Sequence, residues 1–317
     1  MPTKDNILID NFGRKITDLR ISITARCNFN CLYCHNEGQG PVKTAAAYQN
    51  ELSVKEIVQI VRIAREFNIT QVKLSGGEPL IRKDCEEIIA AIAPIVKVSM
   101  VTNGSLLAQK AASLKKAGLS RINVSLDSMN PAIFTSVRGG QIRPVLEGIH
   151  KALEAGIYPV KLNMVIFKNT VNEIEGLLGF VRGHEGLKLQ LIQYMPEIAG
   201  HKERGIEIQE IKRYLAKRAD RIDVRKMHHR RIYYLAGAKV EVVEPVENPE
   251  FCGNCQRLRV TANGYLKGCL NRADDLVSIR NLDDQGVCEA FKQITRERVP
   301  YYFNYLNSQK QKIFASQ

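Results

Sequence analysis

The sequence has no segment typical of an export signal or a membrane span. Its first residues, MPTKDNILIDNFGRKITD, contain no apolar run of the kind found in signal peptides. No later segment approaches the roughly 20 apolar residues that a membrane helix needs. We therefore expect a cytoplasmic protein without a membrane partner. In that reducing setting, clustered cysteines are more often metal ligands or catalytic groups than disulfides.

The chain also lacks a low-complexity linker and a surplus of acidic residues. It contains 46 Lys and Arg against 33 Asp and Glu, a net charge of +13. This excess fits a partner that carries phosphates, either nucleotide or nucleic acid, although a solvated basic surface explains it equally well. The densest basic run, residues 217–231, has no interleaved aromatics of the kind that bind single strands, which argues against nucleic acid. We expect this run to lie mostly at the surface.

Six short β-rich segments alternate with amphipathic helical segments. The strand candidates are residues 20–24, 71–75, 96–102, 121–127, 159–167 and 187–195. After the first of them, Ser53 and Glu56 form a capping-box pattern at the start of a helix that reaches Phe67. Such alternation predicts parallel strands with helical crossovers. We predict an α/β fold, a partial (βα)6 barrel of TIM type, with an open doubly wound sheet as the alternative.

In a barrel, functional groups gather at the C-terminal ends of the strands. Polar and glycine-rich clusters do fall there: TARC after the first strand, SGGEP after the second, TNG after the third and SLD in the fourth. After about residue 226 the pattern changes to short β segments, a second cysteine group and a helical tail. We divide the chain into a barrel, residues 1–235, and a C-terminal extension, residues 236–317.

Three cysteines lie within eight residues in CNFNCLYC: Cys27, Cys31 and Cys34. Three thiolates at this spacing can hold three irons of a four-iron cluster and leave the fourth iron open to a small molecule. Structural zinc sites use four protein ligands, so zinc would need a ligand such as His35, which directly follows the third cysteine. The spacing therefore favours an iron–sulfur cluster.

A second group, Cys252, Cys255 and Cys269, lies in FCGNCQRLRVTANGYLKGCL and again offers three thiols. Taken alone, it fits zinc and an iron–sulfur cluster equally well. Cys85 and Cys288 each stand alone in a helical pattern, and we expect them to be structural.

Two motifs carry a resemblance to a known family. RCNFNCLYC, followed some forty residues later by SGGEP, resembles the radical S-adenosylmethionine superfamily. The CQRLR segment at the second cysteine group resembles the C-terminal cluster motif of the GTP 3′,8-cyclases of molybdenum-cofactor biosynthesis, and the likeness extends from DLRISITARC to about residue 275. The resemblance implies S-adenosylmethionine and two [4Fe-4S] clusters as cofactors, with one cluster on each cysteine group.

The resemblance implies a lyase of molybdopterin biosynthesis that acts on GTP. In that family a 5′-deoxyadenosyl radical removes hydrogen from the ribose C3′, which then adds to guanine C8. GTP would lie between the clusters, with its base at the second. A low-potential electron donor is implied as a partner, and a homodimer is left open.

The resemblance also implies which residues bind these molecules. By motif position, the S-adenosylmethionine contacts are Tyr33, Gly77, Ser125 and Met195. The GTP contacts are Arg20, Lys73, Lys161, Arg257, Leu258 and Arg259. Guanidinium groups suit a triphosphate because they pair with phosphate oxygens through two hydrogen bonds. For Lys73, a salt bridge within the protein is the alternative.

Three departures from the family pattern keep other functions open. Val101 replaces a hydroxyl residue, for which Thr102 could compensate, and Gln256 replaces an asparagine. The sequence ends KIFASQ, without the Gly-Gly pair of many members. The alternatives are a related two-cluster enzyme acting on another nucleotide or a peptide, and a basic zinc or iron–sulfur protein that binds nucleic acid.

Overall fold

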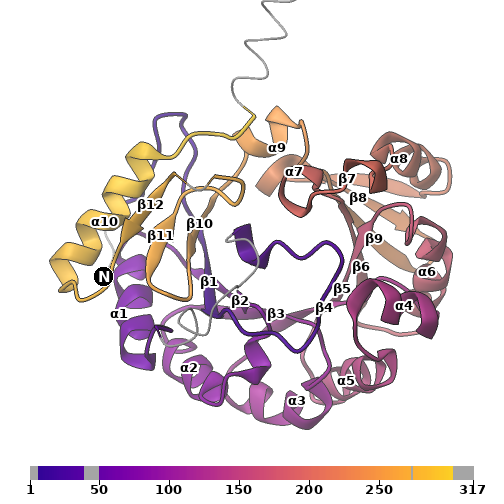
Figure 1. The fold of residues 1–317 in the computed structure, drawn as a ribbon, viewed down its shortest axis with the longest axis horizontal. Helices are drawn as coiled ribbons and strands as arrows, with labels where there is room; N and C mark the ends of the chain where they lie inside the picture. Colours follow the sequence, from indigo (N-terminus) through magenta and orange to yellow (C-terminus); the bar gives the residue numbers. More distant parts are fainter. Residues whose placement is uncertain (1–5, 39–49, 273, 303–317) are drawn as a thin grey trace, which may run out of the picture.

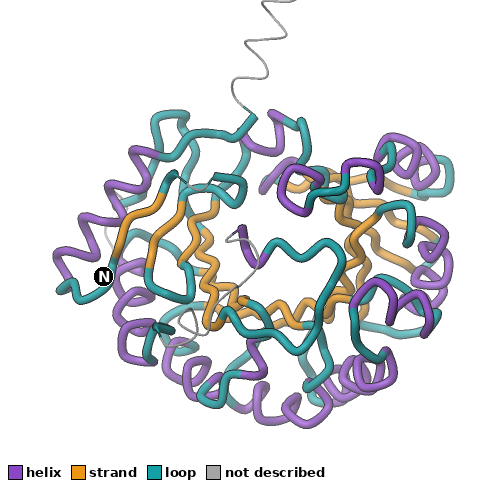
Figure 2. Tube along the Cα trace, in the orientation of Figure 1, coloured by secondary structure: helices purple, strands orange, loops and turns teal. Residues whose placement is uncertain are grey.

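A curled sheet forms the wall of the molecule, and helices cover its outer face (Figures 1 and 2). The computed structural model describes residues 6–38, 50–272 and 274–302, with side chains at all of these except 197 and 198. Within them the sheet has twelve strands, in the order β12-β11-β10-β1-β2-β3-β4-β5-β6-β9-β8-β7. The C-terminal KIFASQ lies outside the described residues.

The centre of the sheet is built from six parallel strands. They are β1 (Asp18–Thr24), β2 (Gln71–Gly76), β3 (Lys97–Thr102), β4 (Arg121–Ser125), β5 (Val160–Ile166) and β6 (Leu187–Gln193). The sheet curls around an open middle, so the predicted partial barrel is confirmed and the flat, doubly wound alternative is wrong (Figure 1).

Helical crossovers connect these strands on the outside of the sheet. They are α1 (Val54–Glu66), α2 (Cys85–Ile92), α3 (Leu107–Lys116), α4 (Pro131–Arg138), α5 (Ile142–Glu154) and α6 (Ile174–Arg182). The predicted capping box is present, since Ser53 accepts the amide of Glu56 and the Glu56 carboxylate accepts the amide of Ser53. Cys85 is buried at the start of α2.

The C-terminal half extends the sheet at both ends. At one end, β9 (Ala238–Val243) pairs parallel to β6, and β8 (Arg230–Leu235) and β7 (Arg221–Arg225) follow it towards the edge. At the other end, β10 (Arg257–Val260) pairs parallel to β1, and β11 (Tyr265–Lys267) and β12 (Leu276–Ser278) follow it. The remaining α-helices in the described chain are α7 (Pro196–Ala199), α8 (Ile208–Ala216), α9 (Pro249–Gly253) and α10 (Asp284–Glu297). The division that we drew at residue 235 falls in the turn between β8 and β9, and it stays a prediction.

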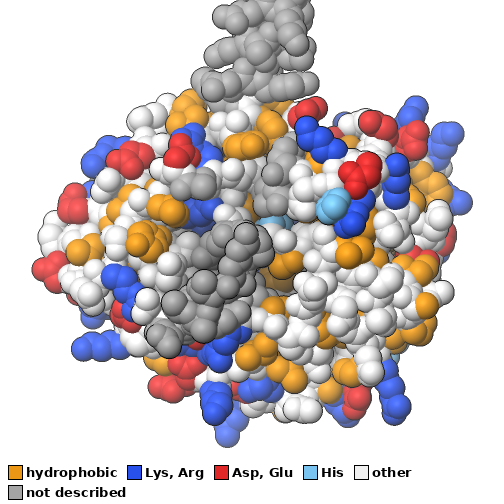
Figure 3. Space-filling view, in the orientation of Figure 1, with side chains coloured by type: hydrophobic (Ala, Val, Ile, Leu, Met, Phe, Trp, Pro, Cys, Tyr) orange, Lys and Arg blue, Asp and Glu red, His pale blue; other side chains and the backbone are white. Residues whose placement is uncertain are grey.

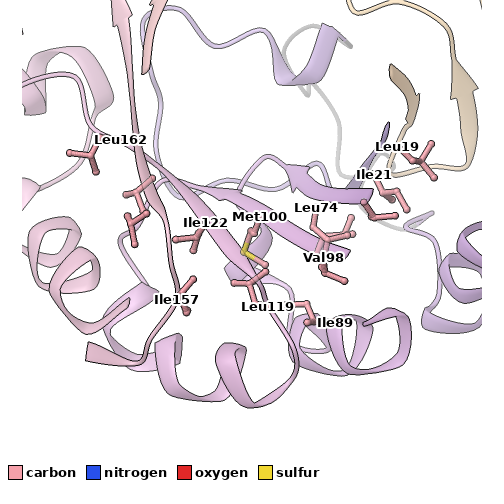
Figure 4. Close-up of a cluster of buried hydrophobic side chains, with 14 of the residues drawn as sticks. Leu19, Ile21, Leu74, Ile89, Val98, Met100, Leu119, Ile122, Ile157 and Leu162 are labelled. Carbon is pink, nitrogen blue, oxygen red and sulfur yellow. The ribbon is translucent and has the colours of Figure 1, made fainter. Parts of the chain in front are cut away.

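Alternation along the strands separates an apolar outer face from a polar inner one. Leu19 and Ile21 of β1 and Leu74 of β2 are fully buried and belong to the cluster that packs under helix residues such as Ile89 (Figure 4). Arg20, between the two β1 residues, points to the other face because successive side chains of a strand alternate. A TIM barrel fills its interior with branched apolar side chains. Here the polar inner residues leave room for a cavity.

None of the described helices is long and apolar enough to cross a membrane.

The contact between α1 and α10 leads to a prediction about whether the C-terminal segment unfolds together with the rest of the protein. Phe291 of α10 is fully buried, and its ring centroid lies 6.0 Å from that of Phe67. We expect Phe291→Ala to lower the free energy of unfolding by about 3–5 kcal/mol, in a single transition because one sheet spans the described chain. Denaturant unfolding followed by circular dichroism measures this. Val224→Ala, at a half-exposed position, is the control. Two separate transitions would contradict the expectation.

Candidate functional site

The first three cysteines lie on the loop that follows β1 and crosses the open middle of the sheet (Figure 1). Cys27 Sγ accepts the amide of Phe29 at 3.4 Å, and Cys31 Sγ lies 3.8 Å from the carbonyl oxygen of Arg138. Burial raises the pKa of Cys31 to about 12 against the opposing charge of Arg138, and the Cys34 and Cys27 thiols contribute to the increase. Three thiols that interact in this way fit a shared cationic group, which would stabilise their thiolates.

Tyr33, on the same loop, is held by a buried ion pair. Its hydroxyl donates to the Asp127 carboxylate and accepts from Arg138 Nη1, which lies 3.2 Å from Asp127 Oδ2. The Tyr33 ring meets Phe167 edge to face, with centroids 5.9 Å apart. Both the position and the plane of the predicted adenine-contacting ring are therefore determined before any ligand binds.

The SGGEP turn after β2 packs against the end of β1. The amide of Gly77 donates to the carbonyl of Thr24 at 2.8 Å, and that of Glu78 to the carbonyl of Arg26 at 2.7 Å. A Cβ at Gly77 would lie 2.1 Å from the Arg26 oxygen, so this glycine is required by the protein's own backbone. These two N–H groups are therefore occupied by the protein itself, and an amine ligand, which donates hydrogen bonds, would meet carbonyl oxygens of the turn.

The glutamate of this turn has a structural role. Glu78 is fully buried, and its carboxylate accepts from Thr102 Oγ1 and from the amide of Asn103, each at 2.6 Å. Burial raises the pKa of Glu78, although these donors oppose the shift. The Thr102 hydroxyl that could compensate for Val101 is thus engaged with the turn, and neither residue lines the cavity described next.

A cavity of about 560 Å³ occupies the inside of the curled sheet. Twelve of its lining side chains are Lys or Arg and three are Asp or Glu. On the face that Figure 3 shows, basic and acidic side chains are interspersed, so the basic surplus does not form one block there. Five predicted GTP contacts line the cavity: Arg20, Lys73, Lys161, Arg257 and Arg259.

These cations lie along the strands and not only at their C-terminal ends. Strand register places Arg259 of β10, Arg20 of β1 and Lys73 of β2 side by side in one row. Like charges in adjacent positions repel each other, so such a row needs an anion. Glu37 supplies one: its Oε2 lies 2.6 Å from Arg259 Nη1 and 3.4 Å from Arg20 Nη1.

The row nevertheless keeps a surplus of buried positive charge. Burial lowers the pKa of Arg20 to about 10, with Glu37 opposing the shift and Arg259 adding to it. Arg20 Nε is buried and has no hydrogen-bond partner among the described residues. Lys73 hydrogen-bonds Asn123 Oδ1 at 3.2 Å instead of a carboxylate, and burial together with Arg20 lowers its pKa strongly. The salt-bridge alternative for Lys73 finds no partner in the described chain.

A second carboxylate organises the opposite wall. Glu241 of β9 pairs with Lys161 of β5, with Arg230 at 3.0 Å and with Arg225 at 3.3 Å. Burial alone would raise the pKa of Glu241, but Arg230 and Lys161 outweigh it and hold that pKa at about 2. Burial lowers the pKa of Lys161 to about 8 despite this carboxylate. One anion among three cations again leaves the wall positive.

The second cysteine group opens into the same cavity. Cys252, Cys255 and Cys269 all line it, and burial raises the pKa of Cys252 to about 11. Arg14 Nη1 donates to the Cys252 carbonyl at 2.9 Å, and Arg298 Nη2 to the Cys255 carbonyl at 3.3 Å. Arg14 Nη2 and Arg298 Nη1 are buried without a hydrogen-bond partner among the described residues. Both guanidinium groups share one carboxylate, because Asp10 Oδ2 lies 2.7 Å from Arg14 Nε and 3.5 Å from Arg298 Nε. Two cations on one anion beside three thiols fit a group with net negative charge, as three thiolates on a four-iron cluster would be.

All eight cysteines are free thiols. No group of three or more His, Cys, Asp or Glu in the described part of the chain is arranged to hold a single metal ion. Cys288 packs against the core from α10 and belongs to neither cysteine group.

The remaining predicted contacts, those for S-adenosylmethionine and Leu258 for GTP, do not all line the cavity. Met195 lines the cavity, whereas Tyr33, Gly77 and Ser125 do not. The Leu258 side chain is fully buried in the core, so this position could serve a ligand only through its backbone. The assignments of these residues to S-adenosylmethionine and GTP remain predictions.

Sequence reasoning missed several residues of the cavity wall. Glu37 and Glu241 line it, and so do Arg225, His228 and Arg230 from the basic run that we expected mostly at the surface. The run is otherwise mostly exposed, as expected, and these three residues are its exceptions. Alternation in β8 and β9 could have revealed Arg230 and Glu241, but the sequence pattern there indicates only short β segments. Nothing local marks Glu37, which reaches the cavity through a left-handed turn with φ of 53°.

Comparisons with known proteins agree with this arrangement. Residues 21–181 match the model of the Radical SAM superfamily, and residues 187–303 match Molybdenum Cofactor Synthesis C. The chain is 44% identical to "Probable GTP 3',8-cyclase" of Halobacterium salinarum, covering 95% of this chain and 91% of the relative. It is also 44% identical to the protein of that name from Methanosarcina mazei, with 98% and 94% covered. The chain belongs to the GTP 3′,8-cyclase family of radical SAM proteins.

Solved structures share the fold of this cyclase-family chain. Streptococcus suis SuiB bound to precursor peptide SuiA gives a TM-score of 0.65 at 15% identity, covering 89% of this chain and 67% of that one. The structure of tagged anSMEcpe with bound AdoMet gives a TM-score of 0.62 at 14% identity, covering 88% and 82%. At these identities the likeness establishes the curled α/β architecture alone. Membership of the radical SAM superfamily entails a [4Fe-4S] cluster and S-adenosylmethionine, and the cyclases carry two clusters.

The packing of the SGGEP turn leads to a prediction about Gly77. Gly77→Ala places a Cβ within 2.1 Å of backbone oxygen, so the turn and the β1 loop must separate. We expect the melting temperature of the iron-free protein to fall by several degrees, and iron binding to fall with it. Gly179→Ala is the matched control, because a Cβ there meets nothing within 4 Å. Equal melting temperatures for the two variants would contradict this account.

The depressed pKa of Glu241 predicts a pH dependence of stability. A carboxyl group with a folded pKa of about 2 and an ordinary unfolded value stabilises the protein above about pH 5, and this contribution disappears as the pH falls towards 2. We expect the stability difference between wild type and Glu241→Gln to be largest near neutral pH and to shrink across that window. Urea unfolding at several pH values measures it. A difference independent of pH would show that the pKa of Glu241 is the same in the folded and unfolded protein, and would contradict this account.

Proposed function

We propose that this protein is a GTP 3′,8-cyclase that binds GTP in the cavity inside the curled sheet. The observation that carries the proposal is the surplus of cations, twelve Lys or Arg against three Asp or Glu, that line a cavity which also receives the second cysteine group. A triphosphate supplies the negative charge that Glu37 and Glu241 only partly provide, and guanidinium groups suit its oxygens. Family membership supports GTP as the nucleotide.

The first cysteine group, Cys27, Cys31 and Cys34, is proposed to hold one [4Fe-4S] cluster, and Cys252, Cys255 and Cys269 the other. When bound, the first cluster and S-adenosylmethionine would supply the one-electron chemistry by which a hydrogen is removed from the ribose C3′ and C3′ is joined to guanine C8. The contribution of this chain is to bind, orient and shield the reactants.

The predicted S-adenosylmethionine contacts divide between two surroundings. Tyr33 is locked by Asp127 and Arg138, so its ring can present a rigid face to adenine. Met195 is the one of the four that lines the cavity, and we propose that it lies where the cofactor and the nucleotide meet. Gly77 and Ser125 lie at the ends of β2 and β4, on the side of the first cysteine loop.

The cations have distinct proposed tasks. Arg20, Arg259 and Lys73 form the row that would bind the phosphates, and Glu37 keeps the two guanidinium groups close together. Lys161, held by Glu241, can donate to the nucleotide from the opposite wall. Because these side chains are half-buried in a cavity, their interactions with phosphate are less screened than at an open surface.

The proposal includes a low-potential electron donor and a cytoplasmic setting, which free thiols favour. A homodimer is left open.

Release of 5′-deoxyadenosine by the reconstituted, reduced protein under anaerobic conditions tests the function. We expect GTP to stimulate release strongly, with GTP consumed in step, and ATP to have little effect. Cleavage of S-adenosylmethionine that does not depend on GTP would be consistent with a radical SAM enzyme but would exclude GTP as its substrate. It would favour another nucleotide or a peptide.

Arg257→Ala tests the phosphate-binding wall. Arg257 pairs with the buried Asp18 and lines the cavity. We expect KM for GTP to rise by about ten- to a hundredfold, because a charge-assisted hydrogen bond is lost, with little change in substrate-free S-adenosylmethionine cleavage. Asp18→Asn/Arg257→Ala removes the unpaired carboxylate and controls for misfolding, and the exposed Arg221→Ala controls for net charge. Unchanged GTP turnover would exclude the phosphate role.

A further inference from the structure

The turn that ends the basic run has an unusual backbone. In the 3₁₀ turn Met227–His229, both His228 and His229 have left-handed φ angles, 60° and 48°. A left-handed φ angle costs free energy in a residue other than glycine. It is maintained only where contacts with the surrounding structure stabilise it. Here the amide of His228 donates to the carbonyl of Asn254 at 3.0 Å, in the loop between Cys252 and Cys255. The turn is therefore fastened to the second cysteine loop.

This backbone places the His228 ring in the cavity wall. The side chain lines the cavity, and the residue is 7% exposed. One face stacks on Phe251, with centroids 4.0 Å apart and ring planes within 8°. Neither ring nitrogen has a hydrogen-bond partner in the part of the chain that the structure describes. These nitrogens are not among the buried atoms that lack a partner, so the polar edge of the ring is open to the cavity and free to hydrogen-bond a ligand there.

The surroundings keep this ring neutral. Burial lowers the pKa of His228 to about 2, and Arg257 and Arg230 add to the shift. A neutral imidazole has one nitrogen that donates and one that accepts a hydrogen bond. Phosphates have twelve cations available in this cavity, so a neutral ring adds little for them. The neutral imidazole of His228 is better suited to an uncharged heteroaromatic ring of a ligand, whose edge carries both hydrogen-bond donors and acceptors.

We propose that His228 is a specificity residue that hydrogen-bonds the base of the nucleotide bound in the cavity. The inference rests on the proposed function, because that function places a nucleotide there. Phe251 holds the plane of the imidazole, and the link to Asn254 fixes its distance from the second cysteine group. The base is thereby selected by a side chain that contacts no phosphate.

Three variants separate this role from a structural one. His228→Phe keeps a ring on Phe251 but removes both nitrogens. His228→Asn keeps a donor and an acceptor, and asparagine tolerates left-handed φ. His229→Phe is the matched control, because it places the same side chain at the next residue, which also has a left-handed φ angle. His229 is half-exposed, pairs with Glu250 and does not line the cavity.

The measurement is binding of GTP, ATP and inorganic tripolyphosphate to the iron-loaded protein by calorimetry. We expect His228→Phe to weaken GTP about tenfold and to leave tripolyphosphate unchanged, because only base contacts are lost. His228→Asn should recover part of the affinity, and His229→Phe should bind both ligands as wild type does. Equal weakening of GTP and tripolyphosphate, or no change in either, overturns the proposal.

The outcome also distinguishes the two proposals. If wild type prefers ATP and His228→Phe selectively weakens ATP, base recognition by His228 stands and the GTP assignment fails. If wild type cleaves S-adenosylmethionine in response to GTP while His228→Phe binds GTP normally, the cyclase stands and the role of His228 is excluded.

Discussion

Burial of excess positive charge inside the curled sheet is the constraint on which the rest of this structure depends. Lysines and arginines in a strand interior are costly unless anions neutralise them. The lumen supplies three such anions, Asp18, Glu37 and Glu241, and each one holds at least one cation. The remaining positive charge makes the cavity a suitable place for an anionic ligand.

This arrangement relies on the alternation of the strands. The outward residues of β1 to β6 form a continuous apolar layer beneath the helices, which supplies the stability of the fold (Figure 4). Because that layer lies outside the sheet, the inner face is free to carry charge. The sheet does not close, and its two edges are extended by strands from the C-terminal half, which contribute Arg257 and Arg259 on one side and Glu241 on the other.

The loop after β1 connects the two chemical ends of the site. It carries the first cysteine group and Tyr33, and it then sends the Glu37 carboxylate into the row formed by Arg20 and Arg259. A change in the charge state of the lumen therefore acts on the same loop that holds the first three thiols. The Asp127–Arg138 pair anchors its other side, through Tyr33 and the carbonyl near Cys31.

The six strands, the capped α1 helix, the two cysteine groups and the family could all be predicted from the sequence, because they follow from short-range periodicity and from fixed spacings along the chain. The predicted strands also contain Arg20, Lys73 and Lys161, which the family resemblance marked as GTP contacts. That Arg259, Arg20 and Lys73 stand in one row emerges from the folded sheet alone, since strand register joins residues far apart in sequence. The same holds for Glu37 and His228, which reach the cavity through left-handed turns that no local pattern marks. Charge burial is a property of the assembled lumen, and a linear sequence does not display it.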